Sequence, residues 1–392
     1  CIGGAKSSES YLNIPALITA AEMTGCDAIF PGYGFLSENQ DFVEICKLHN
    51  IKFIGPSSEV MEKMADKSKA KEEMVRAGVP VVPGSKGAVR TLDEGKKIAR
   101  EIGYPIMAKA SAGGGGRGMR LIKEEKDFDS QYLAASSEAL AAFGDGTMYL
   151  ERFINNPRHI EVQVIGDSHG NAIHIGERDC SLQRRHQKVI EESPAILLND
   201  ETRAKLHEVA VKATKYLKYE GAGTFEFLAD DKQNIYFMEM NTRLQVEHPV
   251  SEMVSGLDII EWMIKVAEGE KLPPQESIRF RGHAIECRIT AEDPNNFLPC
   301  PGKITQWMVP GGRNVRVDSH IYTNYIVPPY YDSMIGKLIV WGRDREKAIN
   351  IMKRALSEFE VEGIKTNIPF HKKMMENKDF ISNNYDTKYL EN

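Results

Sequence analysis

The sequence predicts a chain of mixed α/β and α+β class, with an open parallel sheet first, a glycine-rich hairpin subdomain next and a mixed β domain last. Three observations support this prediction. Helix and strand patterns alternate over residues 11–57, a run of glycines lies between two apolar segments in KASAGGGGRGMR, and β-branched and aromatic residues dominate from Gly282 onward. The 392 residues, 42% of them hydrophobic, are enough to form two or three domains.

Composition narrows the classes of function. The net charge is −6, so no basic field suggests a nucleic acid or an anionic membrane as a partner. No apolar run is long enough to cross a bilayer, and the first residues do not resemble a signal peptide. The six cysteines are scattered without a CxxC pair, which argues against a zinc site and a disulfide framework. We therefore expect a protein of the reducing cytoplasm that binds neither nucleic acid nor membranes.

The first segment alternates helices with strands. YLNIPALITAAEMTG predicts an amphipathic helix closed by Gly25, CDAIFPGYG a strand that enters a glycine turn, NQDFVEICKLHN a second helix and IKFIGPS a second strand. A glycine turn at the end of a parallel strand is a common position for a ligand, although PGYGFLSE is equally typical of a tight turn that needs positive φ. The chain begins without Met in what resembles the end of a strand, so we expect a piece of upstream structure to be missing.

The later elements follow from the same periodicities. A helix is expected from about Met61 to Gly78, and a strand on each side of the glycine loop. The remaining predicted elements are a strand in YLERFI, a hairpin around DSHGN, a helix in ETRAKLHEVAVKATKYL, a hairpin that joins GAGTFEFLAD to QNIYFMEMN, and a helix in GLDIIEWMIKVAEG. We place domains at 1–57, 58–273 and 282–392, with the hairpin subdomain at about 82–153.

The glycine loop is a candidate phosphate site. Four consecutive glycines, Gly113 to Gly116, leave a backbone that can turn its N–H groups onto phosphate oxygens, and Lys109 and Arg117 flank them. The spacing fits neither GxxxxGK[ST] nor a GxGxxG that opens a helix. Because a strand follows the loop, we expect a flexible hairpin lid; a plain turn or linker is the alternative.

GERDCSLQRRHQKVIEESP gathers charged and amide side chains within a few residues. A solvated loop is the ordinary interpretation of such a run. However, the run lies between apolar strands, and its mixture of hydrogen-bonding groups suits a ribose, phosphates and a small anion. Both interpretations stay open at this point.

Alternation also marks YFMEMNTRLQVEH, which we predict to be one strand. Glu239, Asn241, Arg243, Gln245 and Glu247 then share one face, and a solvated edge face is the simple explanation. Glu226 lies on the preceding strand of the same predicted hairpin, so it can face Glu239 across the turn. Two facing carboxylates repel unless a cation lies between them. Carboxylates with an amide are Mg²⁺ ligands, whereas a coincidental exposed pair is the alternative.

Lys67, Lys109, the glycine loop, ERDCSLQRRHQK, GTFEF and EMNTRLQVEHPVSEM together resemble the ATP-grasp superfamily and, within it, biotin carboxylase, the ATP-dependent component of acetyl-CoA carboxylase. The resemblance covers essentially the whole chain. It implies an ATP-grasp fold with a truncated, Rossmann-like N-terminal domain, a glycine-rich lid and a C-terminal biotin carboxylase domain. The long motifs are specific, whereas the glycine loop alone is not.

The resemblance also implies a role for each matching residue. ATP would contact Lys67, Lys109, Gly115, Gly116, Glu151, Arg152, Phe153, Ile154, His159, Gln183, His186, Glu226, Leu228 and Glu239. Mg²⁺ or Mn²⁺, two ions in all, would bind Glu226, Glu239 and Asn241, while bicarbonate and biotin would bind Lys188, Arg243, Gln245, Val246 and Arg288. The catalytic residues would be Lys188, Arg243, Glu247 as the base and Arg288.

The implied reaction is the carboxylation of biotin on a carrier protein, from bicarbonate and ATP through carboxyphosphate. The implied partners are a biotin carboxyl carrier protein, carboxyltransferase subunits and a second copy of the chain. Phe30 and Arg152 depart from the usual His and Lys of the family, and Arg152 belongs to the implied adenine site. The alternatives are the corresponding part of a pyruvate, propionyl-CoA or methylcrotonyl-CoA carboxylase, another carboxyphosphate-forming ATP-grasp ligase, or a nucleotide-binding regulatory protein.

Overall fold

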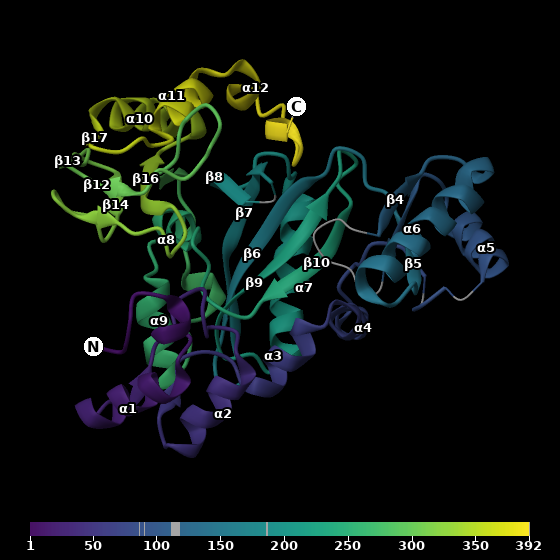
Figure 1. Ribbon diagram of the computed structural model, residues 1–392, viewed down its shortest axis with the longest axis horizontal. Helices are drawn as coiled ribbons and strands as arrows, with labels where there is room; N and C mark the ends of the chain where they lie inside the picture. Colours follow the sequence, from purple (N-terminus) through teal and green to yellow (C-terminus); the bar gives the residue numbers. More distant parts are fainter. Residues whose placement is uncertain (86, 90, 111–117, 186, 392) are drawn as a thin grey trace. The chain divides into compact units, whose positions relative to one another are not determined.

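A computed structural model describes residues 1–85, 87–89, 91–110, 118–185 and 187–391 (Figure 1). The chain divides into two compact units, each of which is described by itself. The first contains residues 1–79, 156–235 and 239–392, and the second contains residues 80–155 and 236–238.

The beginning of the first unit confirms the predicted βα alternation. The helices here are α1 (Ile14–Thr24), α2 (Gln40–Leu48), α3 (Ser58–Ala65) and α4 (Lys67–Ala77), and β1 (Ala28–Ile29) pairs in parallel with β2 (Lys52–Phe53). The Asn13 side chain caps the first turn of α1, and Gly25 ends the helix in the left-handed conformation at φ 67°.

The single helix predicted from Met61 to Gly78 is wrong, because the chain forms two helices there. Asp66 between them has extended backbone angles (φ −88°, ψ 114°), and its carboxylate accepts a hydrogen bond from the Lys69 N–H at 3.0 Å. Asp66 therefore ends α3 and caps the following helix, a role that short polar side chains take readily.

An eight-stranded sheet forms the centre of the first unit, in the order β10–β9–β6–β7–β8–β11–β16–β14. Its strands are β6 (Arg158–Gly166), β7 (Ala172–Arg184), β8 (Gln187–Ser193), β9 (Gly221–Ala229), β10 (Ile235–Asn241), β11 (His283–Thr290), β14 (Val315–Asp318) and β16 (Met334–Gly342). The pairs β6–β7, β6–β9, β7–β8, β8–β11, β11–β16 and β14–β16 are antiparallel. The middle strands are buried along almost their whole length.

Helices cover both faces of this sheet. On one face, α7 (Asp200–Tyr216) packs against β6 and β7. On the opposite face, α8 (His248–Ser255) packs against β7, β8, β11 and β16. Glu177 and Arg178 show that these are opposite faces, because successive strand residues point to opposite sides. Glu177 contacts Arg203 of α7, whereas Arg178 contacts Ser251 of α8. The face under α8 carries the polar cluster described below.

The C-terminal part of the first unit packs three helices and further strands around its own apolar core. The remaining elements are α9 (Ile259–Ala267), β12 (Gly302–Lys303), β13 (Gln306–Met308), β15 (Ile326–Val327), α10 (Arg345–Glu358), β17 (Glu360–Glu362), α11 (Ile368–Glu376) and α12 (Lys378–Ile381). The core joins β11 and β16 to α10, with Ile285, Leu338 and Met352 among its fully buried residues. In Figure 1, α10, α11 and α12 form the yellow end of the chain.

The second unit is a small three-stranded sheet with two helices. Its elements are α5 (Leu92–Ile102), β3 (Ile106–Ala110), β4 (Met119–Ile122), α6 (Phe128–Phe143) and β5 (Met148–Arg152), with the strand order β4–β3–β5. Both strand pairs are antiparallel, as expected for strands on the two sides of the glycine loop. The loop itself, residues 111–117, lies outside the described residues.

The strand predicted over YFMEMNTRLQVEH is correct only in its first half. β10 ends at Asn241, and Arg243 to Glu247 form a loop that leads into α8. The Thr242 N–H donates to the Glu38 carboxylate at 3.0 Å instead of continuing the strand. The five polar residues therefore do not lie 3.3 Å apart along one strand face, although several of them still meet in space.

No helix in the described ranges is long and apolar enough to cross a membrane. All six cysteines are free thiols in the structure, three of them buried: Cys46, Cys180 and Cys287.

Candidate active site

The Lys188 ammonium lies at the centre of the candidate site. Its Nζ contacts Glu161 Oε2 at 2.6 Å, Glu226 Oε1 at 2.9 Å and Glu247 Oε1 at 2.6 Å. The three carboxylates come from β6, β9 and the loop before α8, and the Lys188 side chain is only 12% exposed. Burial lowers the pKa of Lys188, but the three carboxylates outweigh this effect and hold the pKa well above 10.5. The ammonium therefore stays charged and draws the carboxylates together.

Strand register explains why these side chains meet. Glu161 of β6 pairs directly with Glu226 of β9, and Lys188 of β8 pairs with Gln183 of β7. Facing carboxylates destabilise a sheet unless a cation compensates them. Glu161 was missed by the sequence reasoning, which paired Glu226 with Glu239. The alternation of His, Glu and Gln in HIEVQV was the available signal, because these residues share one strand face.

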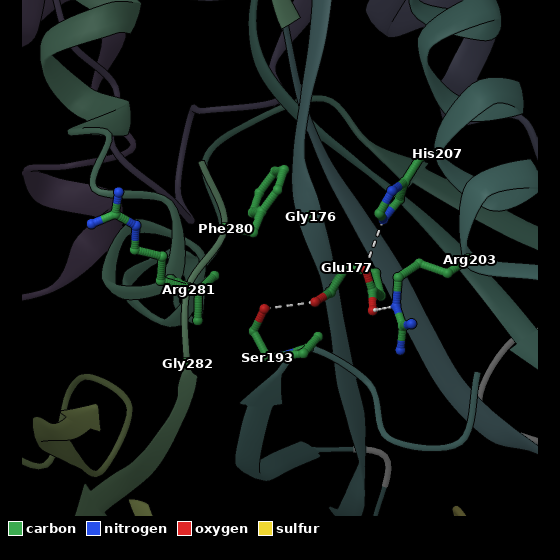
Figure 2. A pocket seen from close by; sticks show the side chains of 10 residues that line it. Gly176, Glu177, Ser193, Arg203, His207, Phe280, Arg281 and Gly282 are labelled. Carbon is green, nitrogen blue, oxygen red and sulfur yellow. Dashed lines mark hydrogen bonds and ion pairs between the residues drawn. The ribbon is translucent and has the colours of Figure 1, made fainter. Parts of the chain in front are cut away.

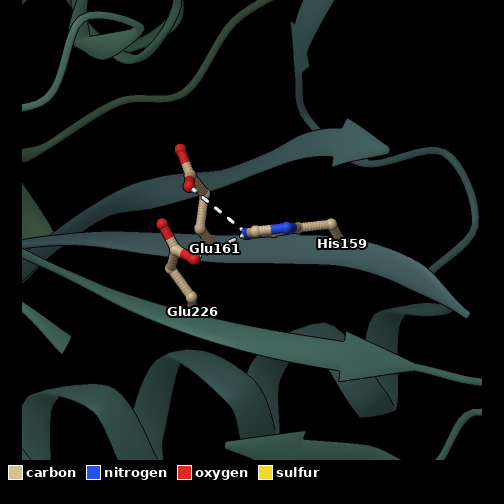
Figure 3. Close-up of side chains that lie close together, drawn as sticks. All are labelled: His159, Glu161 and Glu226. Atoms are coloured by element: carbon tan, nitrogen blue, oxygen red, sulfur yellow. Dashed lines mark ion pairs between the residues drawn. The ribbon is translucent and has the colours of Figure 1, made fainter. Parts of the chain in front are cut away.

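His159 completes this part of the cluster (Figure 3). Its Nε2 lies 3.0 Å from Glu226 Oε2 and 3.8 Å from Glu161 Oε2. Its Nδ1 accepts a hydrogen bond from Gln183 Nε2 at 2.8 Å, which leaves the ring proton on Nε2, toward Glu226. Burial lowers the pKa of His159, but the Glu226 carboxylate outweighs burial, so the net shift is upward.

Oxygen donors suitable for a hard divalent cation gather at the same place. His159, Glu161 and Glu226 each present a potential ligand atom within 4.8 Å of the others. Asn241 lies beside them, because its Nδ2 donates to Glu226 Oε1 at 2.8 Å. Carboxylate and amide oxygens fit Mg²⁺ or Mn²⁺. Glu239, on β10, does not belong to the group of possible ligands found among the described residues, so its metal role stays a prediction.

Arg178 supports the cluster from within the sheet. Its fully buried guanidinium donates to Glu161 Oε1 at 2.5 Å, Gln163 Oε1 at 2.7 Å and Gln245 Oε1 at 2.8 Å. Two further bonds reach hydroxyl groups of β9 and α8. The solvated loop considered for GERDCSLQRRHQKVIEESP is therefore wrong for residues 176–183, which are buried strand. Arg178 lay within that run but was not singled out from the sequence.

Arg288 forms the other end of the site. Its Nε donates to Glu191 Oε1 at 2.6 Å and its NH2 donates to Glu247 Oε2 at 2.9 Å. Both of these partners are buried, so Arg288 is not part of a surface ion pair. Burial raises the pKa of Glu247, but Lys188 and Arg288 overcome burial and hold that pKa well below 4.5. Glu247 is therefore ionised and bridges the two cations.

The loop between β10 and α8 supplies three further predicted residues. Gln245 Nε2 donates to Glu226 Oε1 at 2.9 Å, and Lys337 Nζ donates to the Val246 carbonyl at 2.8 Å. Arg243 NH2 donates to Asn241 Oδ1 at 3.0 Å. Thus Gln245 belongs directly to the Lys188 cluster, while Arg243 joins it through Asn241.

The second unit contains predicted ATP contacts of its own. Lys109 Nζ lies 2.5 Å from Glu151 Oε2, across the neighbouring strands β3 and β5. The Arg152 guanidinium donates to the Ile102 carbonyl at 2.8 Å. Phe153 and Ile154 follow β5, and Ile154 is buried.

The other predicted ATP contacts lie elsewhere in the chain. Leu228 lies half-buried on β9, one residue from Phe227 of the core. Gly115, Gly116, His186 and the side chain of Lys67 lie outside the described residues.

A separate cavity of about 270 Å³ lies beside α7 (Figure 2). At its wall, Glu177 Oε1 accepts a hydrogen bond from Arg203 Nε at 2.8 Å, and Glu177 Oε2 lies 2.6 Å from His207 Nε2. Burial raises the pKa of Glu177, but His207 and Arg203 lower it to about 2. Because its oxygens are fully used by neighbouring groups, this carboxylate is suited to hold α7 on the sheet, and the sequence reasoning did not single it out.

Comparison with known families agrees with the geometry. The biotin carboxylase N-terminal domain matches residues 1–61, the ATP-binding domain of the carbamoyl-phosphate synthase L chain matches residues 66–275, and the biotin carboxylase C-terminal domain matches residues 286–392. Biotin carboxylase from Nostoc sp. is 56% identical over 393 residues, which is all of this chain and 88% of the relative. Biotin carboxylase 1 of Bacillus subtilis is 52% identical with the same coverage.

Solved structures show the same fold. A crystal structure of biotin carboxylase from Campylobacter jejuni, described as a β,γ-ATP complex, is 69% identical, with a TM-score of 0.91 over all of this chain and 88% of that one. The biotin carboxylase domain of a thermophilic 2-oxoglutarate carboxylase bound to bicarbonate is 49% identical, with a TM-score of 0.95 over 99% of this chain and 86% of that one. The resemblance drawn from the motifs is thus confirmed: this chain belongs to the biotin carboxylase family of ATP-grasp enzymes and is an ATP-dependent carboxylase.

Proposed function

We propose that this chain carboxylates biotin on a biotin carboxyl carrier protein, using ATP and bicarbonate, as the first half-reaction of an acetyl-CoA carboxylase in fatty acid synthesis. The observation that supports the chemistry is the continuous buried network from Glu226 through Lys188 and Glu247 to Arg288. It places a group of hard oxygen donors at one end and a guanidinium at the other. The oxygen donors suit the metal ion that phosphate transfer requires, and the guanidinium suits a negatively charged ureido group.

In the first step, a bicarbonate oxygen attacks the γ-phosphorus of ATP, the bond to the β-phosphate oxygen breaks, and ADP leaves with carboxyphosphate formed. Lys188, Arg243, Gln245 and the backbone of Val246 would hold bicarbonate by charge and hydrogen bonds. Glu247 would accept the bicarbonate proton. A carboxylate kept at low pKa by Lys188 is a weak base, so movement of the ammonium toward bicarbonate would make Glu247 more basic at the moment it is needed.

In the second step, the bond between the carboxyl carbon and the phosphate oxygen of carboxyphosphate breaks and phosphate is released. N1′ of biotin gives its proton to this phosphate and forms the new bond to the carboxyl carbon. Negative charge then develops on the ureido oxygen, and the planar Arg288 guanidinium is suited to stabilise it. Glu191 and Glu247 hold this guanidinium from two sides, so its orientation is set before biotin arrives. Arg288 would therefore serve mainly the second half-reaction.

The resemblance assigns nucleotide contacts to residues in several of the motifs. Those to the phosphates would come from Lys67, Lys109, Gly115, Gly116 and His159. Residues 151–154 would hold the adenine edge, with Gln183, His186 and Leu228 nearby. Glu226, Glu239 and Asn241 would bind Mg²⁺ or Mn²⁺, which supplies charge neutralisation of the phosphates.

The identity of the molecule that finally receives the carboxyl group is a separate part of the proposal. EMNTR and IEESP resemble acetyl-CoA carboxylase more than pyruvate carboxylase, which favours a carrier protein and carboxyltransferase subunits as partners, in the cytoplasm. A 2-oxoglutarate carboxylase small subunit from Hydrogenobacter thermophilus is 50% identical, and a biotin carboxylase subunit of pyruvate carboxylase is 52% identical. Another α-keto acid or acyl-CoA acceptor is therefore the second candidate. A homodimer is proposed because a related domain was solved as one.

One assay tests the chemistry and another tests the acceptor. ADP release should depend on bicarbonate and rise further with free biotin; ammonia dependence instead would indicate a carbamoyl-phosphate type of ligase. To identify the acceptor, the carboxylated carrier should be mixed with carboxyltransferase subunits and either acetyl-CoA or an α-keto acid. Transfer of labelled carbon only to an α-keto acid would overturn the acetyl-CoA assignment.

A further inference from the structure

We propose that Glu38, in the turn before α2, is a positioning residue that holds Arg243 in the orientation needed to bind bicarbonate. The inference rests on the proposed function, since it assigns a partner to a residue of the same site. Glu38 belongs to PGYGFLSE, a stretch whose role the motifs left open.

Three hydrogen bonds carry the inference. Glu38 Oε1 accepts from the Thr242 N–H at 3.0 Å and from Thr242 Oγ1 at 3.2 Å, and Glu38 Oε2 accepts from Arg243 Nε at 2.8 Å. One carboxylate thus holds both the backbone that leaves β10 and the guanidinium that follows it. The two segments lie 205 residues apart in the sequence.

The hydrogen bonds of the other Arg243 nitrogens show which N–H groups can still bind an anion. NH1 donates to the Leu244 carbonyl at 3.2 Å, and NH2 donates to Asn241 Oδ1 at 3.0 Å. An arginine has five N–H groups, so three have acceptors within the described residues and one remains on each terminal nitrogen. Two N–H groups on neighbouring nitrogens are what a bidentate oxyanion requires.

Glu38 is itself held in place by its surroundings. Leu36 and Ser37 are buried, and the Asn39 side chain caps α2 immediately after it. The preceding turn passes through Phe35 at φ 48°, a conformation that a bulky residue adopts only when neighbouring structure enforces it. A carboxylate on such a fixed turn can set the position of a flexible arginine.

A simple surface ion pair is the competing explanation. The Glu38 side chain is 40% exposed and that of Arg243 22%, and exposed pairs usually contribute little. However, a surface pair joins only two side chains. Glu38 also binds the Thr242 backbone at the point where the strand ends, so losing its charge should disturb the anion site and leave nucleotide binding intact.

The test is the Glu38→Gln variant with bicarbonate and ATP kinetics. Glutamine keeps an acceptor for Thr242 but presents no charge to Arg243, so the KM for bicarbonate should rise about 10- to 100-fold, the weight of a charge-assisted hydrogen bond. The KM for ATP should change less than about twofold, and the thermal unfolding midpoint should stay the same. Glu44→Gln, on the exposed side of α2, is the matched control and should match wild type.

A double variant separates positioning from independent effects. In an Arg243→Gln background, Glu38→Gln should add nothing further, because its effect passes through that arginine. If the effects of the two substitutions on the KM for bicarbonate add, the inference is overturned. It is also overturned if Glu38→Gln leaves the KM for bicarbonate unchanged in a protein whose wild type depends on bicarbonate. Parallel rises in both KM values with a lower unfolding midpoint would also overturn it, in favour of a structural role. If the wild type shows no bicarbonate dependence at all, the proposed function fails instead.

Discussion

Glu191 and Glu192 are neighbours on β8, both are almost completely buried, and they behave in opposite ways. Glu192 lies 2.7 Å from His283 Nε2, accepts from Arg345 Nε at 2.6 Å and also bonds the Tyr385 hydroxyl. Burial raises its pKa, but His283 and Arg345 more than reverse this effect. Among the described residues, Glu191 accepts a hydrogen bond from Arg288 alone and its Oε2 has no partner. Burial raises the pKa of Glu191 to about 7.

The contrast separates the two faces of the sheet. On the Glu192 face, each buried carboxylate has enough donors to close its hydrogen bonding, so the cluster is suited to hold elements together. On the Glu191 face, Glu191 Oε2 and both carboxylate oxygens of Glu286 have no hydrogen-bond partner among the described residues. An unsatisfied buried group costs stability, and such costs gather where a ligand or a proton completes the site. We therefore assign folding to one face and chemistry to the other.

The largest expected effect is on the chemical face. Glu247→Gln keeps the shape and some hydrogen bonding but cannot accept a proton, so bicarbonate-dependent ATP cleavage should fall ~10²–10⁴-fold. ADP release at saturating ATP measures it. The unfolding midpoint should change little by comparison. A loss below threefold would show that the proton leaves by another route.

Glu192→Gln tests the structural face. It leaves Arg345 and His283 without their anionic partner, and breaking a buried pair from one side costs about 3–5 kcal/mol of unfolding free energy. The pKa of Glu192 is depressed in the folded state, so its contribution is present above the unfolded value of about 4.5 and is lost as pH falls. The difference from wild type should therefore be large at pH 7 and smaller near pH 4 in denaturant titrations. A strong loss of kcat with unchanged stability would break the division between the faces.

Arg288→Lys should affect the two half-reactions unequally. A flexible ammonium cannot reproduce the planar fork that Glu191 and Glu247 hold, so biotin carboxylation should fall about 10- to 100-fold. Bicarbonate-dependent ATP hydrolysis should fall much less. Both rates are measured on the same preparation, one by labelled carboxybiotin and the other by ADP. A large parallel fall would mean that Arg288 serves bicarbonate or folding instead.

Much of the fold was predictable because it is encoded locally. Gly25 ends α1 as expected, and the hairpins formed by β6 with β7 and by β9 with β10 follow from alternation and turn residues. The errors at Asp66 and at Asn241 have different sources. Asp66 was a capping residue within a helical pattern, which the periodicity did not reveal. The end of β10 depends on Glu38, some 200 residues away, and no local pattern contains it.

The site was predictable only where a motif names its residues. Lys188, Glu226, Gln245 and Glu247 were singled out and do meet. Glu161 was not, because it looks like an ordinary strand residue until the register places it against Glu226. Arg178 and Glu191 lay within the charged run GERDCSLQRRHQKVIEESP, but no role was assigned to either of them from the sequence. Strand alternation predicts which residues share a face, but cross-strand partners depend on the topology of the sheet.

The smallest expected effect concerns Glu286, the residue directly opposite Glu191 on β11. It is completely buried, and neither of its carboxylate oxygens has a partner among the described residues. Burial is the main cause that raises its pKa well above 4.5; Lys337 and Arg288 oppose the shift, and Glu191 and Glu247 add to it. A carboxyl group in this position is best buried in its neutral form, which presents an O–H toward unsatisfied acceptors.

Glu286→Gln mimics that neutral form, so the stability difference between this variant and the wild type should depend on pH in a defined direction. A raised folded pKa means that the wild type is most favoured below about pH 4.5 and loses stability as pH rises, because the unfolded chain releases the proton and the folded one retains it. Glutamine has no proton to release, so the variant should unfold about 2–4 °C higher than wild type at pH 8, with no gain near pH 4.5. The exposed Glu208→Gln change on α7 is the control for surface charge. A variant that is less stable at pH 8 would show that Glu286 is ionised and serves as a counterion of Arg288 or Lys337, and the chemical face would then be balanced in charge as the other face is.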